Sequence, residues 1–209
     1  MAAGVVQGAD GRPRCWWCGE APEYVAYHDR EWGRPVMDDV RLLEKLCLEG
    51  FQAGLSWITI LRKRDAFRRA FRGFDPEAVS RFGRRDVARL LADPSIVRHR
   101  GKIAAAIGNA RAMTSGRESE GSLARLVWRY EPPPAARPRK VTRAALRRLA
   151  ETPTSRALSK ALQGHGFRFV GPTTCYAFMQ AMGIVNDHLD GCALRGEVEL
   201  ERARAPRPD

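Results

Sequence analysis

Helix start and stop signals recur along this chain, whereas the alternation of apolar and polar residues typical of β-strands is absent. Asp75-Pro76 supplies an N-cap followed by a proline at the first helical position, and Asp93-Pro94 restarts the chain before a long alanine-rich segment. Apolar residues at helical spacing fill the segments between these signals. The pattern predicts an all-α fold, with helices over residues 39–49, 52–71, 75–82, 84–91, 103–113, 122–130, 155–162 and 173–182.

The mostly apolar stretch 47–61 contains residues that a plain core helix would not favour. It carries an acid, Glu49, an amide, Gln52, and two glycines, Gly50 and Gly54. Each glycine costs about 1 kcal/mol in a helix, and a buried carboxylate needs a partner. Two interpretations remain open: a packed helix pair whose Glu49 reaches solvent, or a site in which another group approaches the backbone closely.

Residues 164–171 form a loop bounded by glycines, Gly164 and Gly171, between two predicted helices. Such a loop exposes the amides at the start of the second helix, where the helix dipole favours an anion. The segment is therefore a candidate clamp for a DNA phosphate, although an ordinary helix pair would have the same pattern.

Charge favours a polyanionic partner. Lys and Arg number 36 against 24 Asp and Glu, which gives a net charge of +12. No run of 18 apolar residues is present to span a membrane, and the N-terminus does not resemble a signal peptide. Five cysteines without a secretion signal indicate reduced thiols and a cytoplasmic protein.

The 209 residues are enough to bury a real core. We expect a disordered leader at 1–13, one domain of two helical lobes at 14–195, and a disordered tail at 196–209. Within the domain, the proline-rich segment 131–140 is predicted to be an extended linker.

Aromatic residues gather in the N-terminal quarter, which holds four of the five tryptophans. A core could accommodate all of them, but so could a pocket for a flat ring, since stacking on a base contributes about 1–3 kcal/mol per contact. The residues concerned are Trp16, Trp17, Trp32, Trp57, Tyr24, Tyr27 and Phe51.

Thiols and imidazoles near both chain ends suggest a metal site. Cys15 and His28 at one end, with His188 and Cys192 at the other, make a set typical of a structural, four-coordinate zinc. Cys18 is an equally orthodox fourth ligand in place of His28, and spacing alone does not choose between them.

Seven sequence segments together make a specific pattern that extends from Cys15 to Cys192. By this pattern the chain closely resembles the bacterial type-I DNA-3-methyladenine glycosylases of base-excision repair. The segments are Cys15-x-Trp17, Tyr27-His28-Asp29-x-Glu31-Trp32-Gly33, Leu48-Glu49-Gly50-x-Gln52-Ala53-Gly54-Leu55-Ser56-Trp57, Arg98-His99-Arg100-Gly101-Lys102-Ile103, Asn109-Ala110-Arg111, Phe169-Val170-Gly171 and Val185-Asn186-Asp187-His188.

The resemblance implies a helix-hairpin-helix glycosylase fold with its hairpin at 164–171. It also implies zinc held by Cys15, His28, His188 and Cys192, and so favours His28 over Cys18. The expected activity is removal of N3-methyladenine from double-stranded DNA by a monomer, with free 3-methyladenine as the product and no strand cleavage.

The resemblance places the base-recognising carboxylate on Glu49, with Tyr27 beside it. Four aromatic residues would supply stacking faces or pocket walls: Trp57, Trp32, Trp17 and Tyr24. We expect Leu55 to fill the gap left by the extruded base, and three hairpin residues to contact phosphates: Gly171, Thr173 and Arg168.

Related glycosylases carry a catalytic aspartate where this chain has Asn186, with Asp187 next to it. An attack driven by that aspartate is therefore in doubt, which fits a base already activated by methylation. Two other functions compete with the glycosylase: a DNA-binding module without chemistry, and an RNA-binding or tRNA-modifying protein. Neither gives a role to an acid among aromatic residues.

Overall fold

The computed structural model describes residues 4–208, apart from the side chains of residues 117 and 118. The predicted all-α fold is confirmed in part: the chain is mostly helical, but it also contains a small two-stranded sheet. The α-helices are α1 (Pro22–Arg30), α2 (Asp39–Gln52), α3 (Trp57–Ala70), α4 (Pro76–Ser80), α5 (Arg84–Ala92), α6 (Arg100–Glu120), α7 (Leu123–Trp128), α8 (Arg143–Arg147), α9 (Pro153–Gly164), α10 (Pro172–Ala181) and α11 (Arg195–Arg204). Three short 3-10 helices, η1 (Trp16–Cys18), η2 (Arg72–Phe74) and η3 (Pro134–Ala136), and two strands, β1 (Val5–Gln7) and β2 (Pro13–Cys15), complete the elements.

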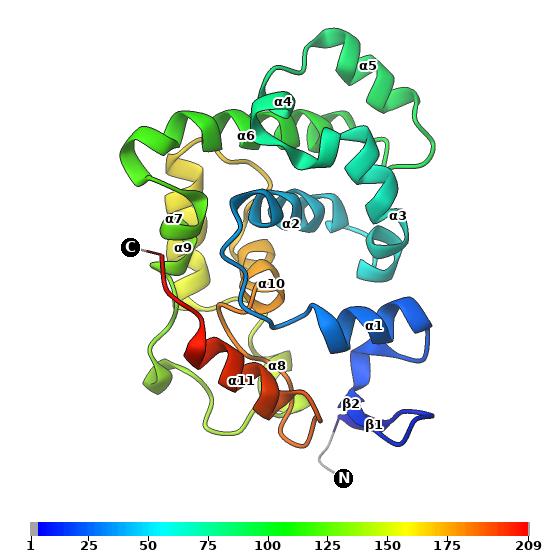
Figure 1. Cartoon of the computed structure of the whole chain (residues 1–209), viewed down its shortest axis with the longest axis vertical. Coiled ribbons are helices and arrows are strands. Elements are labelled where there is room, and N and C mark those ends of the chain that lie inside the picture. The colour runs from blue at the N-terminus through cyan, green and yellow to red at the C-terminus, as the bar shows by residue number, and fades with distance from the viewer. Residues whose placement is uncertain (1–3, 209) are drawn as a thin grey trace.

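Helix α2 lies near the centre of the molecule, with α6 on one side and α10 on the other (Figure 1). Asp38 caps its first turn by accepting a hydrogen bond from the Arg41 amide. Burial continues around most of the helix, because Leu42, Leu46 and Phe51 are all at most 1% exposed. A helix buried on so many sides is a fixed support for the residues that it carries.

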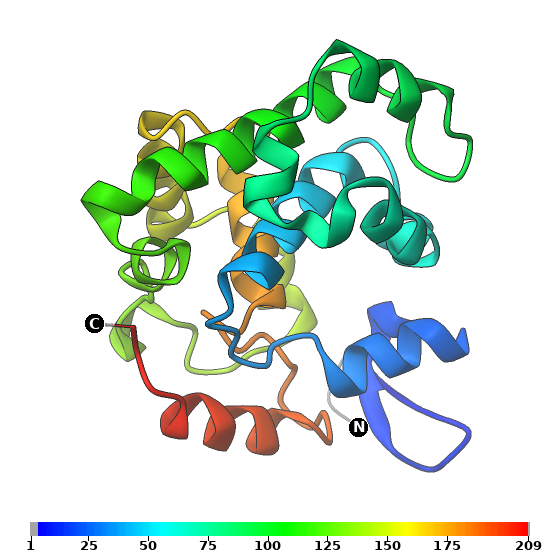
Figure 2. The same cartoon turned by 45° about the horizontal axis from the view of Figure 1, so that its top comes forward.

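Elements near the two ends of the chain lie at one end of the molecule, where strands β1 and β2 and helix α11 are close to each other in two views (Figures 1 and 2). The strands pair antiparallel, with Val5 opposite Cys15. A second hydrophobic cluster, separate from the main core, joins these ends through Val5, Cys15, Val141, Leu189, Cys192, Leu194 and Val198.

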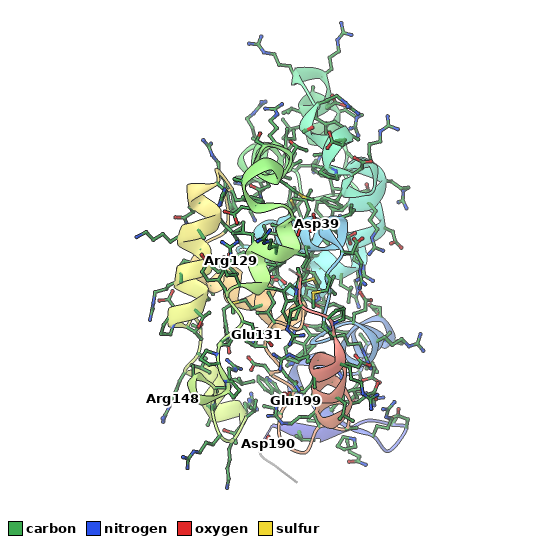
Figure 3. All side chains as sticks on the ribbon, turned by 60° about the vertical axis from the view of Figure 1, so that its left-hand side comes forward. Asp39, Arg129, Glu131, Arg148, Asp190 and Glu199 are labelled. Carbon is green, nitrogen blue, oxygen red and sulfur yellow. The ribbon has the colours of Figure 1, made fainter. Side chains whose placement is uncertain are left out.

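The expected disorder at 1–13 and at 196–209 is therefore wrong for most of both segments. Val5 and Val198 are buried in the second cluster, which stabilises the strand pair and α11. Arg202 adds hydrogen bonds from α11 to the Gly183 and Ile184 carbonyls. Glu131 and Glu199 lie on the side of the molecule that α11 covers (Figure 3), and both pair with Arg202.

The stretch 47–61 is not one helix, because residues 53–56 form a loop between α2 and α3. Gly54 has a φ of +82°, a conformation that favours glycine, and Ser56 is the N-cap of α3. Helix α3 thus begins five residues later than the predicted start at 52. Helices α1, α8 and α11 had not been predicted, whereas α6 extends beyond the predicted 103–113 in both directions.

The loop between α9 and α10 is held from behind by α6. The Asn109 side chain accepts a hydrogen bond from the Arg168 amide at 2.8 Å and donates to the Arg168 carbonyl at 3.2 Å. Ser159 donates to the Val170 carbonyl at 2.6 Å. Among the described residues, no helix has the length and apolar character needed to cross a membrane.

Candidate active site and metal centre

A cavity of about 360 Å³ opens between the N-terminal segment, α2, α3 and α10. All six predicted base-binding residues line it, although they come from four separate elements, η1, α1, α2 and α3, and from the turn after α1. The complete lining is Trp16, Trp17, Tyr24, Tyr27, Trp32, Glu49, Gln52, Trp57, Leu146, Arg147, Leu149, Ala150, Thr173, Tyr176, Ala177 and Gln180.

Aromatic rings make up one continuous wall of this cavity. The Trp17 ring lies 5.3 Å from the Tyr24 ring and 4.8 Å from the Trp32 ring, centroid to centroid. Tyr27 and Trp57 form a second pair at 5.3 Å. Several flat faces around a small cavity suit a planar aromatic ligand.

Helix α10 supplies the opposite wall with residues that the sequence analysis missed or assigned elsewhere. Thr173, Tyr176, Ala177 and Gln180 follow one another at the three- and four-residue spacing of a single helix face. That spacing was a usable signal. Thr173, expected to contact a phosphate, lies in the cavity lining, and Gly171 is the N-cap of α10.

Glu49 does not reach solvent, because its side chain is only 6% exposed. Its Oε1 lies 2.6 Å from the Nζ of Lys45, one helical turn earlier on α2. Lys45 also donates to the Tyr27 hydroxyl at 2.9 Å, and its Nζ lies 3.2 Å from the centre of the Trp57 ring. The sequence analysis missed Lys45, although its four-residue spacing from Glu49 was a signal for an ion pair.

Burial changes the acid–base behaviour of this group. It lowers the pKa of Lys45 to about 8, against the opposing effect of Glu49, and it raises the pKa of Tyr27 well above its usual value. The buried Nε1–H of Trp57 has no hydrogen-bond partner in the part of the chain that the structure describes. Tyr27 is therefore a neutral phenol at physiological pH, and Trp57 has a donor to offer to a ligand.

Two exposed apolar side chains stand near the C-terminal end of α2. Leu55, in the loop 53–56, is 43% exposed, and Phe169, in the loop between α9 and α10, is 41% exposed. A Cβ atom placed on Gly50 would lie only 3.1 Å from the Cβ of Phe169. Gly50 thus permits another group to approach the backbone of α2 closely, as the second interpretation of the stretch 47–61 required. The group that approaches is the loop between α9 and α10.

Neither Asn186 nor Asp187 lines the cavity. Asn186 donates hydrogen bonds toward α11, to the Arg195 carbonyl and the Glu199 carboxylate. Asp187 is fully buried and accepts from Tyr176 at 2.6 Å, from Gln180 at 2.7 Å and from Arg137. Its carboxylate is thus engaged behind the α10 wall rather than directed at a ligand.

Two thiols and two imidazoles, from residues near the two ends of the sequence, converge beside the cavity. The ligand atoms of Cys15, His28, His188 and Cys192 all lie within 4.8 Å of one another. Cys192 Sγ is 3.5 Å from His188 Nδ1 and 3.6 Å from His28 Nε2. Ligand atoms around a tetrahedral zinc are separated by about 3.6 Å for a nitrogen and sulfur pair, so the cluster has the dimensions for a metal ion.

The surroundings of the two imidazoles also suit a metal site. His28 Nδ1 lies 2.8 Å from Asp29, and His188 Nε2 lies 3.0 Å from the Trp32 carbonyl. Such contacts fix which ring nitrogen faces a metal. The hydrogen bond between the two thiols lowers the pKa of Cys192 and raises the pKa of Cys15, so the pair favours one thiolate, the form of cysteine that binds metals.

Cys18 does not join this cluster, although the sequence left it as an alternative to His28. Its Sγ instead lies 3.6 Å from the Gly19 carbonyl. The cluster found among the described residues therefore contains the ligand set implied by the resemblance.

Comparisons with known proteins agree with this arrangement. Residues 17–195 match the methyladenine glycosylase family. The chain is 50% identical over 183 residues to DNA-3-methyladenine glycosylase 1 of Escherichia coli (strain K12), which covers 86% of this chain and 95% of that protein.

Solved structures give the same result. A crystal structure of 3-methyladenine DNA glycosylase I has a TM-score of 0.80 at 47% identity, covering 86% of this chain and 98% of that one. A variant of such an enzyme in complex with 3-methyladenine has a TM-score of 0.79 at 34% identity, covering 86% and 95%. Since the match takes in most of the sequence and both walls of the cavity, this chain belongs to the methyladenine glycosylase family.

Proposed function

We propose that this protein is a base-excision repair glycosylase that extrudes N3-methyladenine from alkylated double-stranded DNA and hydrolyses its N-glycosidic bond. The observation that supports this most directly is the buried carboxylate of Glu49 at the edge of an aromatic cavity. A module that only grips DNA needs neither the acid nor the cavity. The relatives named above are enzymes of this activity, and one was solved with 3-methyladenine bound.

The chemistry of the substrate sets what the protein must do. Methylation at N3 places a positive charge on adenine and weakens the bond between its N9 and the sugar. When that bond breaks, the base leaves with the electron pair as a neutral molecule, and water adds to the sugar carbon and loses a proton. The protein therefore has to find, extrude and orient the base rather than protonate it.

Glu49 and Tyr27 are the groups that we assign to base recognition. Lys45 engages Oε1 of Glu49, and we assign Oε2 as the acceptor for the exocyclic amine of the base. Trp57 and the Trp17 wall stack on its faces. No aspartate attack is included, because Asp187 is turned to Tyr176 and Gln180.

DNA is held by the loop between α9 and α10, which we propose to be the hairpin of a helix-hairpin-helix fold. Gly171 opens the first turn of α10, where free amides meet a phosphate, and Arg168 adds positive charge. Leu55, exposed after α2, enters the gap left by the extruded base. We expect the protein to act as a monomer in the bacterial cytoplasm, without cutting the strand.

The metal that we propose for the Cys15, His28, His188 and Cys192 cluster is a single structural Zn²⁺. Two thiols and two imidazoles are the mixture that zinc prefers, and four protein ligands leave no position for a reacting molecule. Zinc would supply a link between the chain ends rather than a step of the reaction.

The test is incubation of the protein with DNA methylated at N3 of adenine, followed by chromatography of the released bases. We expect free 3-methyladenine in amounts that grow with time. If only intact DNA is recovered while binding persists, the protein is a binding module and the glycosylase assignment is wrong.

Glu49→Gln is the matched variant for this assay, because it keeps the shape of the side chain and removes its charge. A hydrogen bond to a charged group contributes about 1.5–3 kcal/mol, so we expect excision to slow by about 10- to 150-fold. Glu44→Gln, on the same helix but outside the cavity lining, should retain the wild-type rate.

A further inference from the structure

The ammonium group of Lys45 contacts three cavity residues at once. Its Nζ lies 2.6 Å from Glu49 Oε1, 2.9 Å from the Tyr27 hydroxyl and 3.2 Å from the centre of the Trp57 ring. A lysine has three N–H donors and no acceptor. Each donor therefore has one partner, and each partner is a residue assigned above to the methylated base.

A lysine at this position has no packing rationale. It is 5% exposed on the face of α2 that also carries Leu42 and Leu46, where an apolar side chain would fill the same space without the cost of burying a charge. Retaining a charge in such a place requires partners that hold it. Glu49 is the one carboxylate that an ion pair joins to Lys45 in the described chain.

Of the other charged groups around Lys45, Arg41 is exposed to solvent, and the rest are paired with each other. Arg64 binds both oxygens of Glu31, and Arg68 binds Glu44. These pairs join α3 to α2 and to Glu31, the residue after α1. Because each pair balances its own charges, the Lys45–Glu49 pair sets the charge at the cavity.

The contacts of Lys45 have two consequences for a bound base. Because Lys45 donates to the Tyr27 oxygen, the phenolic hydrogen of Tyr27 points elsewhere and is free to donate. Because the ammonium covers one face of Trp57 and neutralises Glu49, the cavity holds less negative charge for a cationic base than an unpaired carboxylate would.

We propose, on the basis of the glycosylase function above, that Lys45 is a positioning residue which fixes Glu49, Tyr27 and Trp57 and makes the cavity favour the neutral, departing base over the cationic one. Stabilising the cationic base would strengthen binding of the substrate without lowering the barrier. A cavity whose charges are balanced instead stabilises the state in which the bond to the sugar is breaking.

The test uses single-turnover excision rates of wild type, Lys45→Met and Lys45→Arg from about pH 6 to about pH 10. The charged form of Lys45 exists below its pKa of about 8, so the wild-type rate should fall as the pH rises through that value. Lys45→Met should be slower by about tenfold below this pH and should lose the dependence. Lys45→Arg remains charged over the whole pH range, so its excision rate should not fall above the pKa of Lys45.

A second readout is the affinity for free 3-methyladenine, which is neutral. We expect Lys45→Met to bind it several-fold more weakly, since Glu49 and Tyr27 are no longer held. Leu46→Ala, a core change on the same helix, should lower the melting temperature without changing the pH profile. If Lys45→Met keeps the wild-type pH profile or affinity, the positioning role is wrong; if wild type itself releases no 3-methyladenine, the glycosylase function fails instead.

Discussion

At the scale of single residues, Leu55 offers the clearest separation of function from stability. Its side chain is 43% exposed in the loop 53–56, so Leu55→Ala should change the free energy of unfolding by less than about 0.5 kcal/mol. We expect excision from duplex DNA to slow by about tenfold, because nothing then fills the space of the extruded base. The measurement is the single-turnover rate on duplex DNA, together with the affinity for free 3-methyladenine, which should not change.

Leu200→Ala is the control for that change, since Leu200 is a 58% exposed leucine on α11, away from the cavity lining. It should leave both the rate and the affinity at wild-type values. Equal slowing by the two variants, or loss of affinity for the free base in Leu55→Ala, would contradict a wedge role for Leu55.

The residues of the cavity were predictable where their type was unusual for its surroundings. Glu49 was found because an acid interrupts an apolar stretch, and the tryptophans because they gather in one quarter of the chain. Lys45 was not identified, because a lysine four residues before a glutamate is typical of an exposed helix face. Only the structure shows that Lys45 is buried behind the cavity wall, in contact with three residues that line the cavity.

At the scale of elements, helix α2 carries cavity residues and contacts the proposed DNA-binding loop between α9 and α10 at Gly50. A substitution at Gly50 therefore tests whether this contact matters for DNA binding. In Gly50→Ala, the added Cβ would lie 3.1 Å from Phe169 Cβ, which is tighter than normal packing. The backbone next to Phe169 is held in place, because Asn109 bonds both the amide and the carbonyl of Arg168. We expect weaker binding to undamaged duplex DNA and a lower melting temperature.

Gly108→Ala provides the matched control, because Gly108 is also inside a helix, α6, and no other described part of the chain comes within 4 Å of its added Cβ. This variant should gain about 0.5–1 kcal/mol of stability from the better helix propensity of alanine and bind DNA as wild type does. A similar gain of stability in Gly50→Ala would show that the loop between α9 and α10 moves aside at no cost in stability, and it would contradict this prediction.

Helix order was predictable from the sequence, whereas helix ends and short elements were not. The capping signal at Asp75 marked a real helix start, with a side-chain hydrogen bond to the backbone as expected. The loop 53–56 was missed because apolar residues continue through it. Strand β1 has only three residues, one buried and two exposed, and such a short segment cannot show the alternation of apolar and polar residues by which strands are recognised.

At the scale of the whole molecule, the chain ends are ordered by contacts between residues that lie far apart in the sequence. Val5, near the start, and Val198, near the end, share one small cluster with two of the candidate metal ligands. Local patterns carry no trace of such contacts, and the polar, proline-containing composition of both ends indicated disorder. The candidate metal site and the ordered segments at both ends of the chain thus depend on the same cluster of contacts.

If zinc holds these ends together, its removal should affect them first. We expect one Zn²⁺ per chain by elemental analysis, and a loss of about 5 kcal/mol on chelation should lower the melting temperature by about 10–20 °C. Hydrogen exchange should accelerate in β1, β2 and α11 and remain slow in α2, which the main core buries on most sides. His28→Ala should lose the metal, whereas Cys18→Ser should keep it, because Cys18 lies outside the four-ligand cluster. Retention of zinc by His28→Ala, or uniform exchange along the whole chain after chelation, would show that the metal does not join the ends in the way the geometry indicates.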